Sequence, residues 1–286
     1  MKPTGWARSS DGLRLAYYLS QADPGVPTVL AVHGYPDNAS VWEPLVAAVG
    51  PGLRVLRFDV RGTGYSDQPA DRGAYRLELL AHDAAAVLTA AEVGPAHLLG
   101  HDWGSVQGWH FVTAPQLQAR LLSFTSISGP NPAYLRPWIR QKVAARDLGP
   151  VWSQLAHSAY IGLFKLPWLP ELAWRSGLID RVLSRTEPAA ERSWADKLAG
   201  LQLYRVNLLT RRGPRPLPVE LPVLVLAPTG DRYIRPDVAV ETPRPYVADL
   251  QAELVPGGHW LPLTDAGLLA RLLTDFIASR SPGRAA

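Results

Sequence analysis

The sequence predicts an α/β fold in which a mostly parallel sheet is flanked by helices and interrupted by one helical insertion. Three observations lead to this prediction. Short apolar runs end near glycine or aspartate, which is typical of strands buried on both faces of a parallel sheet. Stretches with helical spacing separate these runs, as in doubly wound sheets. Between two of the runs, residues 131–218 contain no strand-like stretch.

Six apolar runs are the expected strands. They are Leu13–Leu19, Thr28–Val32, Val55–Val60, His97–Leu99, Leu121–Ile127 and Val223–Ala227. We expect the first of them to be half-buried and the other five to be buried on both faces of the sheet. Helical spacing follows the third and fourth strands, over Leu77 to Ala90 and over Ser105 to Thr113.

The strand–helix alternation breaks once, over residues 131–218. This segment is rich in aromatic residues and is interrupted by prolines. Most of its aromatic residues are expected to form a small core of its own. We therefore expect residues 1–130 and 219–286 to form one core, with residues 131–218 inserted between two of its strands as a helical cap.

The composition excludes several classes of protein. The 286 residues are 47% hydrophobic and 19% charged, which is enough to bury a core and excludes wholesale disorder. No long uncharged apolar run is present, so we expect no transmembrane helix and no stable membrane insertion. Residues 1–21 lack the apolar stretch of a secretory signal, and the absence of cysteine excludes disulfides and thiolate ligands. These features predict a cytoplasmic protein.

The charge balance does not point to a nucleic-acid partner. Lys and Arg number 29 against 25 Asp and Glu, which gives a net charge of +4. The basic residues are scattered, without a long basic run and without the ligand spacing of a zinc finger. Scattered arginines of this kind are typical of a solvated surface, so we expect no binding to nucleic acid.

The sharpest local signal is the pentapeptide Gly-His-Asp-Trp-Gly at residues 100–104. It lies where an expected strand ends and an expected helix begins. Small residues on both sides of the central one allow a tight turn that exposes the central side chain. This is the spacing of a nucleophile elbow, with Asp102 in the place where esterases and lipases carry serine. The alternative is an aspartate that caps the following helix, but the two glycines and Trp103 favour the nucleophile.

Further motifs accompany the elbow in a fixed order along the chain. The stretch 33–36 is His-Gly-Tyr-Pro, and the stretch 59–66 is Asp-Val-Arg-Gly-Thr-Gly-Tyr-Ser. Asp231 follows the strand after the insertion, and His259 lies in a late Gly-Gly-His-Trp stretch. Together with the elbow, these motifs resemble the α/β-hydrolase superfamily over nearly the whole chain.

The resemblance implies a carboxylate nucleophile within an Asp-His-Asp triad. Asp102 can displace a leaving group at a saturated carbon and form an alkyl–enzyme ester. His259, held in one tautomer by Asp231, can then deprotonate a water molecule that attacks the ester carbonyl. The backbone N–H groups of Tyr35 and Trp103 are the expected oxyanion hole.

Two tyrosines of the expected cap help to identify the reaction. Opening an epoxide produces an alkoxide that tyrosine hydroxyls can bind and protonate, whereas halide displacement needs N–H donors around the departing ion. The stretch around Tyr160 and the Tyr-Arg-Val-Asn stretch at Tyr204 resemble the segments that carry the two cap tyrosines of epoxide hydrolases. Each tyrosine alone would more simply be a packing residue, but the pair at both ends of one cap favours a role in epoxide opening.

The sequence departs from these relatives at two positions. Ala159 stands where epoxide hydrolases often carry tryptophan, so we expect a reshaped pocket there. Tyr35 stands where many haloalkane dehalogenases carry asparagine, whereas Trp103 is shared by both groups and does not distinguish them. The pattern is also similar to the hydrolase half of bacterial proteins that fuse this domain to a short-chain dehydrogenase, and we expect no dehydrogenase downstream of Ala286.

The prediction is therefore a hydrolase that needs no cofactor and no metal and that converts a small apolar epoxide and water to a vicinal diol. Neither the natural epoxide nor the oligomeric state follows from the sequence. Two alternatives stay open. A haloalkane dehalogenase is favoured if the cap tyrosines point away from Asp102, and a catalytically silent ligand-binding module would retain the same fold. A serine esterase is disfavoured, because the elbow residue is aspartate.

Overall fold

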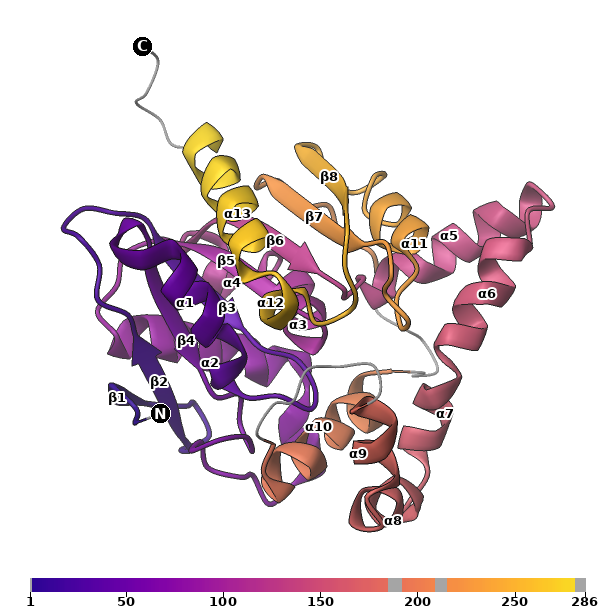
Figure 1. Ribbon diagram of the computed structural model, residues 1–286, viewed down its shortest axis with the longest axis horizontal. Coiled ribbons are helices and arrows are strands. Elements are labelled where there is room, and N and C mark those ends of the chain that lie inside the picture. The colour runs from indigo at the N-terminus through magenta and orange to yellow at the C-terminus, as the bar shows by residue number, and fades with distance from the viewer. Residues whose placement is uncertain (1, 185–191, 209–214, 281–286) are drawn as a thin grey trace.

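The computed structural model describes residues 2–184, 192–208 and 215–280, and its strands form one eight-stranded sheet (Figure 1). The strands are β1 (Gly5–Arg8), β2 (Arg14–Leu19), β3 (Thr28–Val32), β4 (Arg54–Phe58), β5 (Ala96–His101), β6 (Leu121–Ile127), β7 (Val223–Pro228) and β8 (Leu250–Val255). Their spatial order is β1-β2-β4-β3-β5-β6-β7-β8. The pairings of β1 with β2 and of β2 with β4 are antiparallel, and the other pairings are parallel. The predicted α/β fold with a mostly parallel sheet is confirmed.

The sequence prediction missed the two edge strands, β1 and β8. Leu13–Leu19 is therefore not the first strand, as expected, but the second. Both edge strands expose apolar side chains, such as Leu254 in β8, and neither is a continuous buried run. Only strands covered on both faces show the apolar run that the prediction relied on. The other predicted strands agree with the structure to within two residues at each end.

The centre of the sheet explains where a functional site can form. All five residues of β3 are buried, with Leu30 opposite Leu56 of β4 and Leu98 of β5. Burying each such side chain contributes about 1.5–3 kcal/mol to stability. Because β3, β5, β7 and β8 are parallel, their carboxyl ends reach the same edge of the sheet. Residues that follow these strands therefore meet at that edge.

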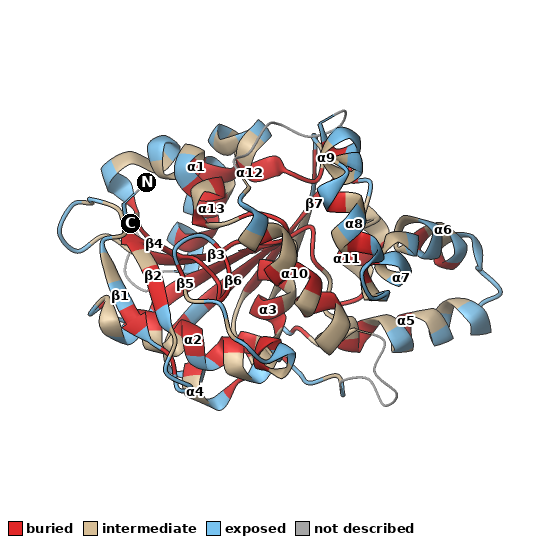
Figure 2. Cartoon of the chain, turned by 90° about the horizontal axis from the view of Figure 1, so that it is seen from below, coloured by how far each residue is buried: buried red, intermediate tan, exposed pale blue. Residues whose placement is uncertain are grey.

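Helices cover both faces of the sheet. They are α1 (Glu43–Val49), α2 (Leu77–Ala90), α3 (Trp103–Phe111), α4 (Pro115–Gln118), α11 (Pro236–Glu241), α12 (Leu261–Thr264) and α13 (Ala266–Arg280), with short 3-10 turns η1 (Ala39–Trp42), η2 (Gly50–Gly52) and η3 (Arg72–Tyr75). In Figure 2, α1, α12 and α13 lie above the sheet, and α2, α3 and α4 lie below it. None of the helices in the described ranges is both long and apolar enough to cross a bilayer.

Between β6 and Asn207 the described residues form helices, which project beyond the sheet on one side (Figure 1). They are α5 (Pro132–Ala144), α6 (Gly149–His157), α7 (Ala159–Lys165), α8 (Leu169–Arg175), α9 (Leu178–Leu183) and α10 (Trp194–Asn207). Residues 185–191 and 209–214 of the predicted cap lie outside the described residues.

The start of α10 is fixed to the loops that follow β3 and β4. Ser193 and Asp196 form a capping box at its N-terminus. The carboxylate of Asp196 also accepts hydrogen bonds from the Gly64 N–H at 2.7 Å and from the Asn38 side-chain amide at 3.1 Å. One buried carboxylate therefore joins the helical segment to two loops at the carboxyl edge of the sheet.

Candidate active site

Asp102 occupies a strained turn between β5 and α3. Its backbone has φ +52° and ψ −120°, a conformation that residues with a side chain rarely adopt and that costs of order 1–3 kcal/mol. The turn is held by the Asp102 N–H, which donates to the Ile127 carbonyl at 3.0 Å. It also requires glycine at residue 104, because a Cβ there would collide with the carbonyl oxygen of Val32. The spacing seen in the sequence thus has a steric basis.

This close contact predicts a large difference between two glycine-to-alanine changes. Gly104→Ala should lower the free energy of unfolding by about 3 kcal/mol or more, because rigid backbone must move to admit the methyl group. Gly162 in α7 has open space where a Cβ would lie. Gly162→Ala should therefore raise the free energy of unfolding by about 0.5–1 kcal/mol, because alanine has the higher helix propensity. Urea unfolding measures both. Equal effects of the two changes would contradict the packing argument.

The two carboxylate oxygens of Asp102 have different surroundings. Oδ1 accepts a hydrogen bond from the backbone N–H of Tyr35 at 2.7 Å. Oδ2 lies 3.5 Å from His259 Nε2. The Trp103 N–H belongs to the first residue of α3, where a helix has no carbonyl of its own to accept it. The geometry thus gives one oxygen a backbone donor and leaves the other beside the imidazole.

His259 is held between Asp102 and Asp231. Its Nδ1 lies 3.0 Å from Asp231 Oδ2 and 3.2 Å from Oδ1. The backbone N–H groups of Tyr233 and Ile234 donate to the same carboxylate. Burial acts to raise the pKa of Asp231, but the charge of His259 and these hydrogen bonds outweigh it and hold that pKa below its ordinary value. The ionised carboxylate fixes a proton on Nδ1 and directs Nε2 towards Asp102.

The charge of His259 depends on its two neighbours. Burial is the largest single influence and lowers the pKa of His259. The charge of Asp231 and the hydrogen bonds to Asp102 and Asp231 act in the opposite direction, and together they raise this pKa to about 10. The imidazole is therefore protonated near neutral pH. Any reaction that neutralises Asp102 removes part of this support, lowers the pKa of His259 and makes the imidazole available as a base.

Asp102→Asn should consequently lower the pKa of His259, because an amide carries no charge and is a weaker acceptor than a carboxylate. Titration of histidine-labelled protein by NMR measures this pKa directly. The exposed Asp265 provides the control, since Asp265→Asn should leave the titration of His259 unchanged. If Asp102→Asn also left the pKa of His259 unchanged, Asp231 alone would be responsible for raising that pKa.

The two predicted cap tyrosines lie on different helices and line one cavity. Tyr160 belongs to α7 and Tyr204 to α10, and their ring centroids are 6.0 Å apart. The cavity has a volume of about 240 Å³ and is also lined by Asp102 and His259. Burial is the largest cause of the raised pKa of both tyrosines, and the negative charge of Asp102 adds to it. Both tyrosines line the same cavity as Asp102.

Aromatic contacts connect these tyrosines to the elbow. The ring of Trp103 lies 4.9 Å from that of Tyr204, centroid to centroid and edge to face, and the Tyr204 ring makes the same kind of contact with Tyr160. Burial holds the pKa of both hydroxyls above the ordinary value, so both phenols keep their protons at neutral pH. Both hydroxyls are therefore possible proton donors in the cavity.

The residues after Tyr204 in the sequence motif hold α10 in place. The Arg205 guanidinium makes two hydrogen bonds to the Glu171 carboxylate, the shorter at 2.7 Å, and donates to the Leu166 carbonyl. Asn207 donates to the Tyr75 carbonyl at 2.9 Å. These contacts position the helix that carries Tyr204.

Sequence reasoning missed Tyr233 and the side-chain contacts of Tyr35. The ring of Tyr233 lies 4.7 Å from that of His259 and 5.5 Å from that of Tyr160, centroid to centroid. Its place two residues after Asp231 is the only signal that could have indicated it. The Tyr35 hydroxyl accepts a hydrogen bond from the Trp174 indole at 2.7 Å and donates to the Lys197 carbonyl at 3.1 Å. A residue expected to act through its backbone therefore also joins α8 and α10 through its side chain.

Ala159 is exposed at the first position of α7 and does not line the cavity that contains Asp102, so its effect on the shape of the pocket stays a prediction. Its neighbour Tyr160 does line it, since the two side chains project from the helix in different directions.

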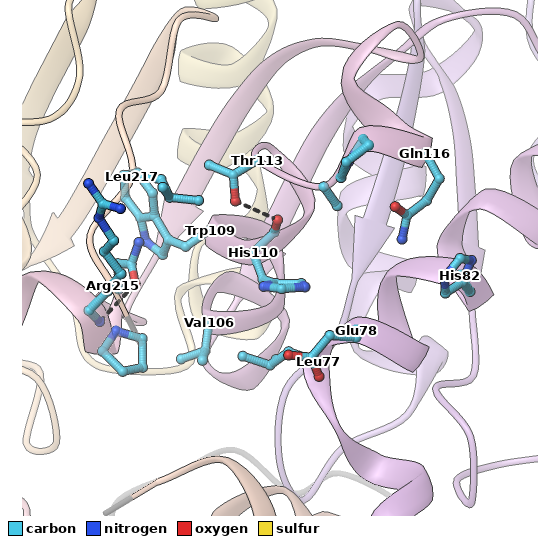
Figure 3. A pocket seen from close by; sticks show the side chains of 15 residues that line it. Leu77, Glu78, His82, Val106, Trp109, His110, Thr113, Gln116, Arg215 and Leu217 are labelled. Atoms are coloured by element: carbon cyan, nitrogen blue, oxygen red, sulfur yellow. Dashed lines mark hydrogen bonds between the residues drawn. The ribbon is translucent and has the colours of Figure 1, made fainter. Parts of the chain in front are cut away.

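A second cavity, of about 320 Å³, lies away from the triad (Figure 3). It is bounded by the side of α2 that carries Glu78 and His82 and by Trp109, His110 and Thr113 at the end of α3. None of the residues expected to be functional lines it. Among the described residues, no group of three or more His, Asp or Glu side chains could hold a metal ion.

Comparisons with known proteins agree with this geometry. The family described as the alpha/beta hydrolase fold matches residues 27–266. "Probable oxidoreductase EphD" of Mycobacterium tuberculosis is 31% identical over 94% of this chain, and the chain spans 48% of that protein, about half its length. "Epoxide hydrolase 3" of Xenopus tropicalis is 25% identical over 96% of this chain and 77% of that protein.

Solved structures show the same fold at lower sequence identity. A mutant of an epoxide hydrolase from Bacillus megaterium, complexed with its diol product, superimposes with a TM-score of 0.79. The two chains are 18% identical, and the match covers 96% of this chain and all of that one. The chain therefore belongs to the α/β-hydrolase fold family and is an epoxide hydrolase-like member of it.

Proposed function

We propose that the protein is an epoxide hydrolase that converts an epoxide to a vicinal diol through an ester at Asp102. One observation carries the proposal: a single cavity is lined by a carboxylate, an imidazole paired with a second carboxylate, and two phenol groups. The epoxide hydrolase-like relatives support the same reaction class.

In the first step, Asp102 Oδ2 attacks a ring carbon and the C–O bond of the epoxide breaks. Oδ1 is held by the Tyr35 N–H, so Oδ2 is the oxygen that is free to react. The electron pair of the broken bond moves to the epoxide oxygen, which takes a proton from Tyr160. Tyr204, whose ring lies 6.0 Å from that of Tyr160, assists by stabilising the negative charge that forms on the phenolate.

In the second step, water hydrolyses the ester. Asp102 is now uncharged, so the pKa of His259 falls and its Nε2 can lose its proton, which returns through water to the Tyr160 phenolate. The neutral Nε2 then takes a proton from the water molecule that attacks the Asp102 carbonyl carbon, and the developing oxyanion on Oδ1 receives hydrogen bonds from the N–H groups of Tyr35 and Trp103. When this intermediate collapses, the ester C–O bond breaks and the second proton of the attacking water moves to the leaving oxygen, which releases the diol and restores the carboxylate. One oxygen of the first diol therefore comes from Asp102.

We further propose that residues 131–218 act as a cap over a core formed by residues 1–130 and 219–286. The cap contributes both tyrosines and most of the apolar wall of the cavity, including Phe164, Trp174 and Ile179. A small apolar epoxide suits such a lining, because its only polar atom meets the tyrosine hydroxyls.

The geometry gives less support to halide displacement. A departing halide would need indole or amide N–H donors facing the cavity. The indole N–H groups of Trp174 and Trp260, which line it, already donate to the Tyr35 hydroxyl and the Asp37 carboxylate. A silent ligand-binding module would not need His259 to lie between two carboxylates.

Oxygen-18 labelling tests the covalent mechanism. With enzyme in excess over an aryl epoxide in oxygen-18 water, the diol from the first turnover should carry no label. The Asp102 peptide should gain the label instead. Labelled diol from the first turnover with an unlabelled peptide would contradict the ester. Halide release from haloalkanes with inert epoxides would indicate a dehalogenase, and ligand binding without turnover would indicate the silent module.

A further inference from the structure

The end of the cap exposes an unusual amount of apolar surface. Twelve of the seventeen large hydrophobic side chains that are exposed in the described residues lie between Val143 and Trp194. At the junction of α7, α8 and α9, which pack against one another away from the sheet (Figure 1), six of them form what we call the rim surface. These are Leu163, Leu166, Trp168, Leu172, Leu178 and Val182. Exposed apolar patches on soluble proteins often mark interaction sites.

Trp168 shows that this exposure has a structural cost. Its side chain is 81% exposed, and its backbone at the start of α8 is left-handed, with φ +62°. That conformation suits glycine and is unfavourable for a bulky residue. Neither burial nor backbone preference explains a tryptophan here, whereas contact with a partner does.

The rim surface is continuous with the active-site cavity. Leu163, Leu178 and Val182 are exposed to solvent and also line the cavity that contains Asp102 and His259. An apolar molecule on the rim surface would therefore be in contact with the wall of the catalytic cavity.

The charges around the rim surface are basic. The acidic residues of α8 and α9 are both in ion pairs: Glu171 with Arg205 at 2.7 Å and Asp180 with Lys197 at 2.9 Å. Arg175 and Arg181, on the same two helices, are exposed. Over residues 131–184, seven Lys and Arg stand against three Asp and Glu, but four of the seven lie between Arg136 and Arg146, on and just after α5. The basic character of the rim surface itself therefore rests on Arg175 and Arg181.

We propose that the rim surface docks on a lipid membrane that carries anionic headgroups, with no spanning segment, and that the epoxide passes from the lipid into the cavity. Tryptophan favours the membrane interface, leucine and valine contact the acyl chains, and arginine binds the headgroups. A second copy of the chain fits this surface less well, because it would bring four exposed arginines, Arg175 and Arg181 of each copy, into one contact without added acidic partners. The part of this proposal that names an epoxide as the molecule entering the cavity rests on the proposed function. Docking on the membrane does not, because it requires no turnover.

Sedimentation with lipid vesicles measures docking without turnover. We expect the protein to bind phosphatidylcholine vesicles that contain phosphatidylglycerol, more weakly as salt is added, and to bind pure phosphatidylcholine much less. Arg175→Glu combined with Arg181→Glu should lower the partition coefficient more than about tenfold. Arg271→Glu, at an exposed position on α13, is the matched control and should lower it far less.

Two apolar changes separate docking from a structural role. Trp168→Gly should weaken vesicle binding while leaving Tm unchanged or raised, because glycine accepts the left-handed backbone. Leu172→Ser should weaken binding about tenfold. Leu254→Ser on β8 is its control, since the two leucines are 62% and 64% exposed.

The outcomes distinguish this proposal from the proposed function. Hydrolysis of a water-soluble epoxide without vesicles reports catalysis alone. Docking would be overturned, even with hydrolysis intact, if the wild-type protein did not bind anionic vesicles. It would also be overturned if the Leu172→Ser and Leu254→Ser variants bound these vesicles equally well. If the protein bound no vesicles and these variants converted a dimer to a monomer, the rim surface would be a contact between two copies. This result would also overturn the docking proposal. Vesicle binding without hydrolysis would support docking and count against the proposed function.

Discussion

His259→Gln should stop the reaction after its first half and trap the protein as an ester at Asp102. Glutamine is close in size to histidine and can donate a hydrogen bond, but it cannot accept the proton of the attacking water. Attack on the epoxide needs only Asp102 and the cap tyrosines, so it should continue. Steady-state turnover should fall by about 10⁴-fold or more, which corresponds to roughly 5.5 kcal/mol of barrier.

Intact-protein mass spectrometry checks this result. The variant should gain the mass of one epoxide molecule per chain, and peptide mapping should place the gain on Asp102. The buried His97, which hydrogen-bonds Ser123 within the sheet at 2.8 Å, provides a matched control. His97→Gln should keep turnover and gain no mass. Loss of turnover in His259→Gln without any adduct would mean that the histidine is needed for the first step.

The common location of the three proposed triad residues could be predicted from the sequence because it depends on topology. Asp102, Asp231 and His259 follow β5, β7 and β8, whose carboxyl ends meet at one edge of the sheet. Short motifs at strand ends therefore indicate a common site even where the sequence pattern does not predict the strand itself. The sequence prediction had no β8, yet its Gly-Gly-His-Trp stretch pointed to His259.

The packing of the cap could not be predicted in the same way. Asp37 accepts hydrogen bonds from the Arg192 side chain at 2.9 Å and from the Trp260 indole at 2.7 Å, and it thereby links segments more than 150 residues apart. No local spacing encodes such contacts. The role of the Tyr35 side chain was missed for the same reason, since its hydroxyl meets the cap helices only after they have packed on the core.

The two cap tyrosines should contribute unequally to epoxide opening. Tyr160 is partly exposed in the cavity wall, whereas Tyr204 is buried against Trp103 and Phe164, so we expect the Tyr160 proton to be the one that reaches the substrate. Tyr160→Phe should lower kcat/KM for epoxide hydrolysis by about 10²–10⁴-fold, the usual contribution of a positioned acid. Tyr204→Phe removes only the support for that acid, so it should have a smaller effect.

A double-mutant cycle distinguishes this arrangement from two independent donors. If Tyr204 acts through Tyr160, Tyr204→Phe should cost almost nothing when Tyr160→Phe is already present, and the effects should be far from additive. Additive losses would mean that each hydroxyl donates directly to the epoxide oxygen. Tyr134→Phe is the control, since this buried tyrosine hydrogen-bonds the Leu217 carbonyl outside the cavity and should leave kcat/KM unchanged. A Tyr160→Phe variant within about threefold of wild type would contradict the acid role altogether, because a positioned acid contributes at least about 10²-fold.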